Sequence, residues 1–268
     1  MTLCQVNNYT RYQAIVSYYG AKGCKNNNYI QQSVEDLINK DSLYELCGRK
    51  NAFLLEKKDG FWRVYYYIND VSEKLILDGE KMVTEILFRG KIGEPIDEVR
   101  YLESCGFKRN LVRDQYSAKH STLTTSSFVN GINIEIAANI KDVLWAINLF
   151  NTTFDRLSGD YLPPECADNI SQLGTILIAK DQKGTLLGAL HMKKQKGISW
   201  LNHVAVIKDA RGKGVGRSLV DAYIQNGYES EDSKYMLWVQ HQNDYAVNLY
   251  QSKGFIYVNK STLSMIRE

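Results

Sequence analysis

The sequence predicts an α/β (α+β) fold in which a mixed, mostly antiparallel sheet is flanked by helices. Two observations carry this prediction. Short runs rich in β-branched and aromatic residues recur in both halves of the chain and indicate strands. Other segments carry apolar residues at helical spacing. At 268 residues, with 44% hydrophobic residues, the chain has the length of two moderate domains and enough apolar side chains for two cores.

The N-terminal half is expected to contain a helix followed by strands. Val34, Leu37, Ile38 and Leu43 recur at helical spacing within residues 33–48. The second of the strand-like runs that follow is rich in tyrosine and suits a buried strand better than a binding platform. The three runs cover residues 51–57, 61–68 and 82–88.

The C-terminal half is expected to alternate strands with helices. The pair Lys183-Gly184 indicates a tight hairpin between two of the strands. The expected strands lie at 132–137, 175–181, 185–193, 198–207, 235–240 and 255–266. The expected helices lie at 140–157, 214–227 and 244–253.

A polar, turn-prone segment at 117–127 separates the two halves and places a domain boundary near residue 130. The two halves share an internal echo. Segments 101–112 and 249–260 both show a helix end, a glycine suited to the C-cap, a phenylalanine and then a strand. The echo predicts that domains 1–130 and 131–268 are duplicated copies of one fold.

Composition and charge exclude several classes of protein. A net charge of +3 lacks the clustered basic excess typical of nucleic-acid binding. The five cysteines are scattered and form no C-x-x-C pair, so neither a disulfide framework nor a zinc site is indicated, and no metal is expected. The first residues lack a signal-peptide pattern and no apolar run could span a membrane. We therefore expect a cytoplasmic protein without nucleic-acid or membrane partners.

The segment DARGKGVGRSLV, residues 209–220, follows one expected strand and opens the next expected helix. Its glycines allow backbone N–H groups to approach a phosphate closely. A helix N-terminus and neighbouring cations favour the same negative charge. The segment alternates three glycines with cations, as Arg211, Gly212, Lys213, Gly214, Val215, Gly216 and Arg217.

Three other interpretations of this loop fit less well. A P-loop requires a Gly-Lys-Ser/Thr that the segment lacks. A dinucleotide fingerprint would need its third glycine where Arg217 stands, and an acidic residue where the next strand ends in Val239-Gln240. A flexible loop that merely ends a strand explains the glycines but not the cations.

The pattern Arg211-x-x-Gly214-x-Gly216 resembles the pyrophosphate loop of the GNAT superfamily, the GCN5-related N-acyltransferases. A second stretch, residues 243–255, agrees with that family's pattern N-x-x-A-x-x-[LF]-Y-x-x-x-G-F. It matches at Asn243, Ala246, Leu249, Tyr250, Gly254 and Phe255. The resemblance covers residues 131–268 directly. It implies a GNAT fold, in tandem with a degenerate N-terminal copy in which Leu102 stands where Tyr250 does.

The resemblance implies an N-acetyltransferase that uses acetyl-CoA as cosubstrate and a small-molecule or peptide amine as acceptor. The primary amine attacks the thioester directly, a tetrahedral intermediate forms, and Tyr250 acts as general acid. The pantetheine arm is implied to bond to the strand that ends Val204-Ala205-Val206. The implied cosubstrate residues are Val204, Ala205, Val206, Arg211, Gly212, Lys213, Gly214, Val215, Gly216, Arg217, Ser218, Asn243, Ala246 and Tyr250.

The general base is not fixed by the resemblance. Where many members of the family carry Glu or His, this chain carries Asn202 and Trp200, which do not titrate and are assigned to substrate binding. His203 would face the other side of a regular strand, so it becomes a candidate base only if a bulge turns it inward. The alternative is a partly buried, hydrogen-bonded histidine. Asp160 and Glu165 could attract a cationic amine or be solvated loop charges.

The missing Glu or His leaves a second class open, a non-catalytic protein that binds or senses CoA. The sequence also leaves a homodimer open.

Overall fold

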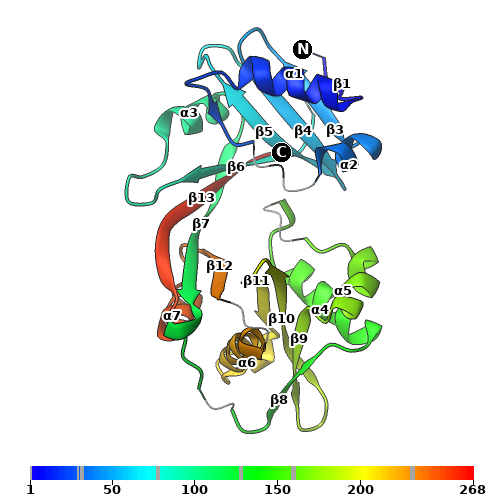
Figure 1. The fold of residues 1–268 in the computed structure, drawn as a ribbon, viewed down its shortest axis with the longest axis vertical. Helices are drawn as coiled ribbons and strands as arrows, with labels where there is room; N and C mark the ends of the chain where they lie inside the picture. The colour runs from blue at the N-terminus through cyan, green and yellow to red at the C-terminus, as the bar shows by residue number, and fades with distance from the viewer. Residues whose placement is uncertain are drawn as a thin grey trace. The chain divides into compact units, whose positions relative to one another are not determined.

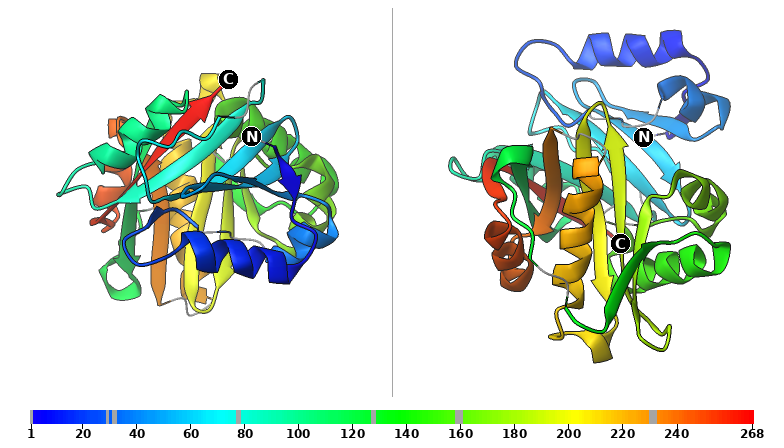
Figure 2. Two further views of the ribbon diagram at one scale, coloured as in Figure 1. Left: turned by 90° about the horizontal axis from the view of Figure 1, so that it is seen from above. Right: turned by 60° about the horizontal axis from the view of Figure 1, so that its bottom comes forward.

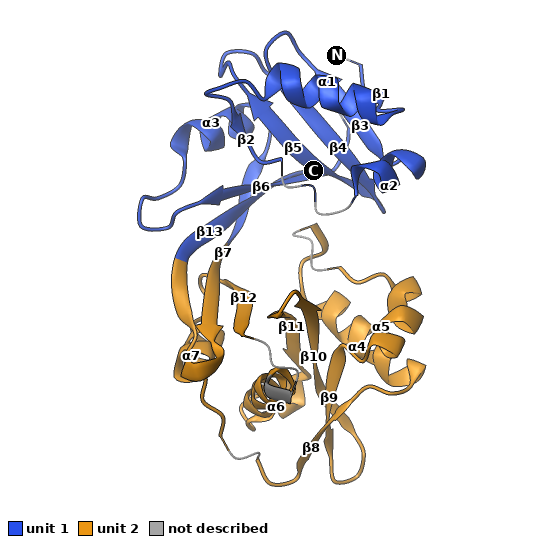
Figure 3. Cartoon of the chain, in the orientation of Figure 1, with its two compact units in different colours: residues 1–112, 259–268 blue, residues 113–258 orange. Residues whose placement is uncertain are grey.

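The computed structural model describes residues 2–28, 30, 33–76, 79–126, 129–157, 161–229 and 233–268. The chain divides into two compact units (Figure 3). Unit 1 comprises residues 1–112 and 259–268, and unit 2 comprises residues 113–258. Both units combine mostly antiparallel strands with helices, which confirms the predicted fold class (Figure 1).

In unit 1, helices cover both faces of the sheet. One apolar cluster packs α1 and α2 on one face, and another packs α3 on the opposite face. The strand order is β1-β3-β4-β5-β6-β13, and β2 pairs with β5. The strands are β1 (Cys4–Gln5), β2 (Lys25–Asn26), β3 (Leu43–Cys47), β4 (Ala52–Lys58), β5 (Phe61–Ile68), β6 (Met82–Phe88) and β13 (Ile256–Arg267). The helices are α1 (Tyr9–Tyr19), α2 (Val34–Asn39) and α3 (Ile96–Ser104).

In unit 2, α6 packs on one face of the sheet, and α4 with α5 on the other (Figures 1 and 2). The strand order is β7-β12-β11-β10-β9-β8. The strands are β7 (Lys108–Lys119), β8 (Ile132–Ile136), β9 (Ile176–Asp181), β10 (Leu186–Gln195), β11 (Ile198–Val206) and β12 (Lys234–Gln240). The helices are α4 (Ile140–Thr153), α5 (Ala167–Leu173), α6 (Val215–Glu229) and α7 (Asp244–Ser252).

The order of elements along the chain repeats. The first half runs β1-α1-β2-α2-β3-β4-β5-β6-α3-β7, and the second runs β8-α4-α5-β9-β10-β11-α6-β12-α7-β13, so the short β2 has no counterpart among the described residues of the second half. Gly106 and Gly254 end α3 and α7 with φ angles of 90° and 96°, values that only glycine adopts easily. The order and the matching caps support a duplication in which the helix equivalent to α6 has no counterpart among the described residues of the first half.

Each unit takes its last strand from the other half of the sequence. In unit 2, β12 pairs with β7 from Lys234↔Lys119 to Gln240↔Arg113. In unit 1, β6 pairs with β13 from Met82↔Arg267 to Phe88↔Ser261. The compact units change over inside β7 and β13, and the boundary near residue 130 between two copies stays a prediction.

The helix expected at 33–48 is wrong in its second half. The helix α2 ends at Asn39, and Asp41 follows with a φ of 51°, which breaks the helical path. Leu43 then begins β3, because Leu43 and Leu46 are buried against the neighbouring strands rather than along a helix. The sequence also did not predict α1, whose first turn is capped by the Asn8 side chain.

The strand exchange generates a testable expectation. A chain that ends before Asn259 lacks the part of β13 that pairs with β6, including the buried Leu263 and Met265. We expect backbone amides of β6 and α3 to exchange hydrogen rapidly in this truncation, while β9 and β10 keep their protection. Removal of the exposed Glu268 alone is the control. If the β6 amides of the longer truncation stayed as protected from hydrogen exchange as in the wild type, the exchange of strands between the two halves would be contradicted.

Candidate functional site

The parallel strands β11 and β12 pair over only part of their length. Their register runs from Ile198↔Lys234 to Leu201↔Leu237. Beyond that point β11 continues to Val206 and β12 to Gln240 without pairing to each other. The two strands therefore part into a V within unit 2.

One arm of the V presents backbone groups that are not paired with β10. Ile207 N–H donates to Leu187 O, which makes Val206 and Gly188 a non-hydrogen-bonded pair of the antiparallel ladder. The N–H and C=O of Val206 therefore point away from β10 and into the V. By the same alternation, Val204 presents its own pair of groups. Such an edge can accept an extended ligand as an added strand.

The loop after β11 is held by two glycines in left-handed conformations. Gly212 has a φ of 75° and Gly214 a φ of 84°, and a Cβ at Gly214 would lie 2.7 Å from Val129 Cγ2. Gly216 differs, because its φ is not positive and a Cβ there would meet only Val206 Cγ2, at 3.7 Å. The fold itself therefore does not require a glycine at position 216.

The N-terminus of α6 lies at the end of this loop. Gly214 precedes the helix and has no side chain with which to cap the first N–H groups, those of Val215, Gly216 and Arg217. Arg211, Lys213 and Arg217 are exposed, and no carboxylate of the described residues lies in an ion pair with them. The Arg211 side chain instead donates through Nε to Val206 O at 3.1 Å. The loop combines the amides of a helix start, a helix dipole and three cations that have no carboxylate partner among the described residues.

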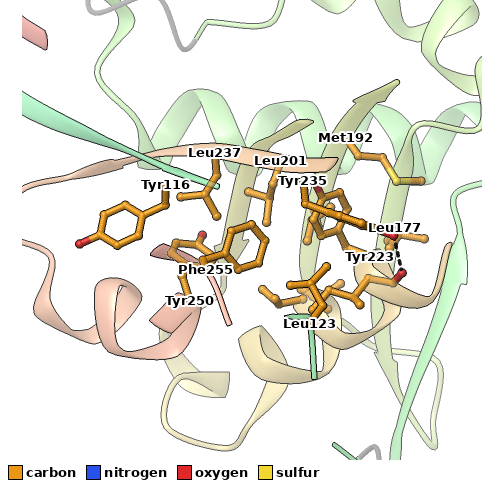
Figure 4. Packing of buried hydrophobic residues seen from close by; sticks show 14 of the residues in the cluster. Tyr116, Leu123, Leu177, Met192, Leu201, Tyr223, Tyr235, Leu237, Tyr250 and Phe255 are labelled. Atoms are coloured by element: carbon orange, nitrogen blue, oxygen red, sulfur yellow. Dashed lines mark hydrogen bonds between the residues drawn. The ribbon is translucent and has the colours of Figure 1, made fainter. Parts of the chain in front are cut away.

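Tyr250 projects from α7 into the core of unit 2. Its side chain is 4% exposed, and its ring meets Phe255 edge-on with 5.9 Å between the ring centres. Figure 4 shows this pair beside Leu201 and Leu237, the last residues paired before the V opens. Burial raises the pKa of the Tyr250 phenol above its ordinary value of about 10. The hydroxyl therefore keeps its proton at neutral pH.

The N-terminus of α7 is fixed by Asn243, whose Oδ1 accepts from Ala246 N–H at 3.1 Å. At the other end of α7, a Cβ at Gly254 would lie 2.2 Å from Thr122 O. Between the two helices, Lys253 Nζ binds Asp221 Oδ1 at 2.5 Å in a fully buried ion pair. This pair, which the sequence analysis did not identify, joins the end of α7 to α6.

A β-bulge turns His203 toward α4. The β10–β11 register shifts between His191↔His203 and Met192↔Leu201, which leaves Asn202 as the extra residue. The His203 ring stacks on Phe150 of α4, with centres 5.1 Å apart and an interplanar angle of 27°. The bulge on which a role for His203 depended is therefore present.

His203 is paired with a second histidine. Its Nδ1 lies 3.3 Å from Nδ1 of His191, and both rings are buried. At this distance one ring donates a proton and the other accepts it. Burial, and then the neighbouring His203 and Lys193, lower the pKa of His191 to about 3. His191 is therefore neutral at physiological pH.

Residues 143–255 match the family model described as the Acetyltransferase (GNAT) family. The chain contains a GNAT domain. This domain lies within unit 2 and holds the V, the glycine loop and Tyr250. No curated protein matches the sequence.

Solved GNAT structures share the fold of the whole chain. A GCN5-related N-acetyltransferase from Sphaerobacter thermophilus is 13% identical, with a TM-score of 0.61, over 89% of this chain and 86% of that one. A GNAT-family acetyltransferase from Colwellia psychrerythraea is 12% identical, with a TM-score of 0.54, over the full length of both chains. A tandem GNAT protein from the clavulanic acid biosynthesis pathway is 11% identical, with a TM-score of 0.58, over 84% and 82%. The likeness therefore includes residues of both units and supports the tandem arrangement.

The GNAT domain brings together most, but not all, of the predicted site residues. Ala205 packs against α4 and is paired with Ala189 of β10, so its backbone is not offered to the V. Ser218 is buried, and its backbone N–H donates to Gly214 O, so it adds no donor to the loop. Both positions were predicted as cosubstrate contacts.

The predicted acceptor residues are only partly placed. Trp200 is half-buried and Asn202 is exposed on β11. Glu165 is exposed in a short 3-10 helix, Pro164–Cys166, between α4 and α5. Asp160 lies outside the described residues.

Two features of the described residues bear on binding of a metal ion and on insertion into a membrane. Among the described residues, no group of three or more His, Cys, Asp or Glu side chains is arranged to hold a metal ion. In the same part of the chain, none of the helices is both long enough and apolar enough to cross a bilayer.

The glycines of the loop generate one expectation. Gly214→Ala should lower the melting temperature, because alanine is strained at a φ of 84° and would collide with Val129. Gly216→Ala should leave stability unchanged or raise it by up to about 1 kcal/mol, because alanine favours a helix over glycine. Thermal unfolding of the two variants tests the difference. An equal fall in melting temperature for Gly214→Ala and Gly216→Ala would show that the fold also requires a glycine at position 216.

The buried pair of His191 and His203 leads to a prediction about how stability depends on pH. His191 has a folded pKa of about 3, below the 6.5 of an ordinary histidine, so the unfolded chain binds this proton more readily. The stability contributed by neutral His191 is complete above pH 6.5 and declines as the pH falls toward 3. Urea unfolding of wild type and His191→Gln between pH 7 and 4 should show a shallower decline in the variant. Parallel curves would contradict the assignment.

Proposed function

We propose that the protein is an acetyl-CoA-dependent N-acetyltransferase that acts on a primary amine, and that its active site lies in unit 2. The observation that carries the proposal is the V between β11 and β12, which opens beside the anion-binding loop and within the cluster that contains Tyr250. A thioester with a long polar arm and a pyrophosphate needs these three features together.

The binding of acetyl-CoA is assigned to distinct groups. The N–H groups of Val215, Gly216 and Arg217 would receive the pyrophosphate, and the nearby cations would add charge-assisted contacts. The pantetheine amides would bond to the backbone of Val204 and Val206 in the manner of an added strand. Gly216 would let the ligand approach the helix, a need that the fold alone does not explain.

The proposed chemistry is direct acyl transfer. The neutral amine nitrogen attacks the thioester carbonyl carbon and forms a C–N bond, and a backbone N–H near Val206 stabilises the resulting oxyanion. Collapse of the tetrahedral intermediate breaks the C–S bond. The departing sulfur takes its proton from Tyr250 Oη, whose raised pKa keeps it protonated until that moment.

The proton of the amine is assigned to His203. Nδ1 of His203 lies within hydrogen-bond distance of Nδ1 of His191, and either ring can donate. When His203 gains a proton, neutral His191 remains available as the acceptor of its Nδ1–H. The exposed Glu165 is proposed to attract the cationic acceptor before it loses its proton. The acceptor class remains a small-molecule or peptide amine.

The free state of all five cysteines supports a reducing compartment, and we propose a cytoplasmic enzyme. A non-catalytic CoA-binding or sensing protein is the alternative. It is favoured by Asn202 and Trp200, which occupy the positions of the usual carboxylate or histidine base.

The two functions are separated by a matched pair of variants. In an assay of thiol release from acetyl-CoA over polyamines, amino acids, aminoglycosides and peptides, Tyr250→Phe should lower kcat by about 10²- to 10⁴-fold and leave the Kd for CoA unchanged. Tyr116→Phe, from the same buried cluster, is the control and should retain activity. CoA binding without turnover on any amine would favour the sensing protein.

A further inference from the structure

Unit 1 contains a V of the same kind as unit 2. Strands β5 and β6 are parallel and pair only from Trp62↔Met82 to Val64↔Thr84. Beyond this point β5 continues to Ile68 and β6 to Phe88. The place of these strands in the repeated order of elements is that of β11 and β12.

The chain itself fills this second V. Strand β2 adds to the free edge of β5, antiparallel, with the pairs Lys25↔Ile68 and Asn26↔Tyr67. The next residue, Asn27, is 3% exposed and lies between β5 and β6, to both of which it is hydrogen-bonded. The V in unit 1 is therefore occupied by residues 25–27.

Asn27 binds both arms of the V at once. On the β5 side, its Oδ1 accepts from Tyr66 N–H at 2.6 Å, and its own N–H donates to Tyr66 O at 3.4 Å. On the β6 side, its Nδ2 donates to Thr84 Oγ1 at 2.9 Å and to Glu85 O at 2.8 Å. A ligand that entered this V would have to replace all of these buried hydrogen bonds.

Tyr66 of β5 and Val204 of β11 occupy corresponding positions at the edges of the two Vs. Tyr66 lies two residues beyond the last β5–β6 pair, and Val204 lies three beyond the last β11–β12 pair, the extra residue being the bulged Asn202. The β4–β5 register has no such shift. The backbone groups that Val204 presents to the V of unit 2 are, at Tyr66, already bonded to Asn27.

The phosphate loop also lacks a counterpart in unit 1. The connection between β5 and β6 shows no helix among its described residues, 69–76 and 79–81. Within it, the Glu73 carboxylate accepts hydrogen bonds from the N–H groups of Arg49, Lys50 and Asn51, which lie between β3 and β4.

We propose that residues 25–27 are a built-in occupant of the thioester groove of the N-terminal copy, so that the chain binds a single CoA, in unit 2. The inference rests on the proposed function for unit 2, and adds the number of sites and the reason for it. Segment 25–27 mimics the hydrogen bonding of a pantetheine arm and, being part of the chain, is always present at high local concentration.

Calorimetric titration of the full chain with CoA tests both proposals separately. We expect one CoA per chain in the wild type and none in Gly216→Leu, whose new Cβ would make an ordinary van der Waals contact with Val206 Cγ2 at 3.7 Å. This variant should fold, as thermal unfolding would verify. Two CoA per chain would overturn the closed groove and leave the proposed function intact. No binding to the wild type would overturn the proposed function, and a single site that survives Gly216→Leu would overturn both.

A second measurement examines the groove without CoA. Hydrogen exchange at the Tyr66 amide should become at least tenfold faster in Asn27→Ala, while the Kd for CoA stays within twofold of wild type. The exposed neighbour Asn26→Ala is the matched control and should leave the exchange rate unchanged. If Asn27→Ala leaves the Tyr66 amide fully protected, residues 25–27 do not close the groove and the inference fails.

Discussion

The early end of the pairing between β11 and β12 is the constraint on which the rest of unit 2 depends. Two parallel strands that stay paired leave no backbone groups for a ligand. Because pairing stops at Leu201 and Leu237, the backbone edge at Val204 and Val206 is not paired with β12. The loop that follows β11 leads to the N-terminus of α6. Tyr250 lies in the same apolar cluster as the last paired residues. The buried pair of Lys253 and Asp221 joins the two helices involved.

The duplicated chain uses this constraint twice, with opposite results. In unit 2 the V is bordered by the first amides of α6 and by cations that have no carboxylate partner among the described residues. In unit 1 the V is closed by the backbone and side chain of Asn27, and the equivalent of Tyr250 is the buried Leu102. The exchange of terminal strands ties the two copies together, because each sheet is completed by a strand from the other half. Unit 1 can thus be needed for folding whether or not it binds a ligand.

The sequence predicted the parts of this structure that have local signatures. The glycine loop, α7 with its capping glycine, and the meander of β9, β10 and β11 all follow from spacing along the chain. The strand exchange does not, because β7 and β13 have the same local pattern whichever sheet they join. The two-residue β2 is too short for any periodicity, and the bulge at Asn202 involves no glycine. Leu43 was misassigned because Leu43 and Leu46 fit helical spacing as well as a strand.

We propose that CoA binds in the V of unit 2 through the backbone of β11 and the first turn of α6. An NMR titration with CoA can follow the amide chemical shifts of both units. We expect the amides of Val204, Val206, Val215, Gly216 and Arg217 to shift with a common saturation curve, while those of Tyr66 and Thr84 in unit 1 do not move. Shifts that saturate at Tyr66 and Thr84 and leave the β11 and α6 amides unchanged would contradict it.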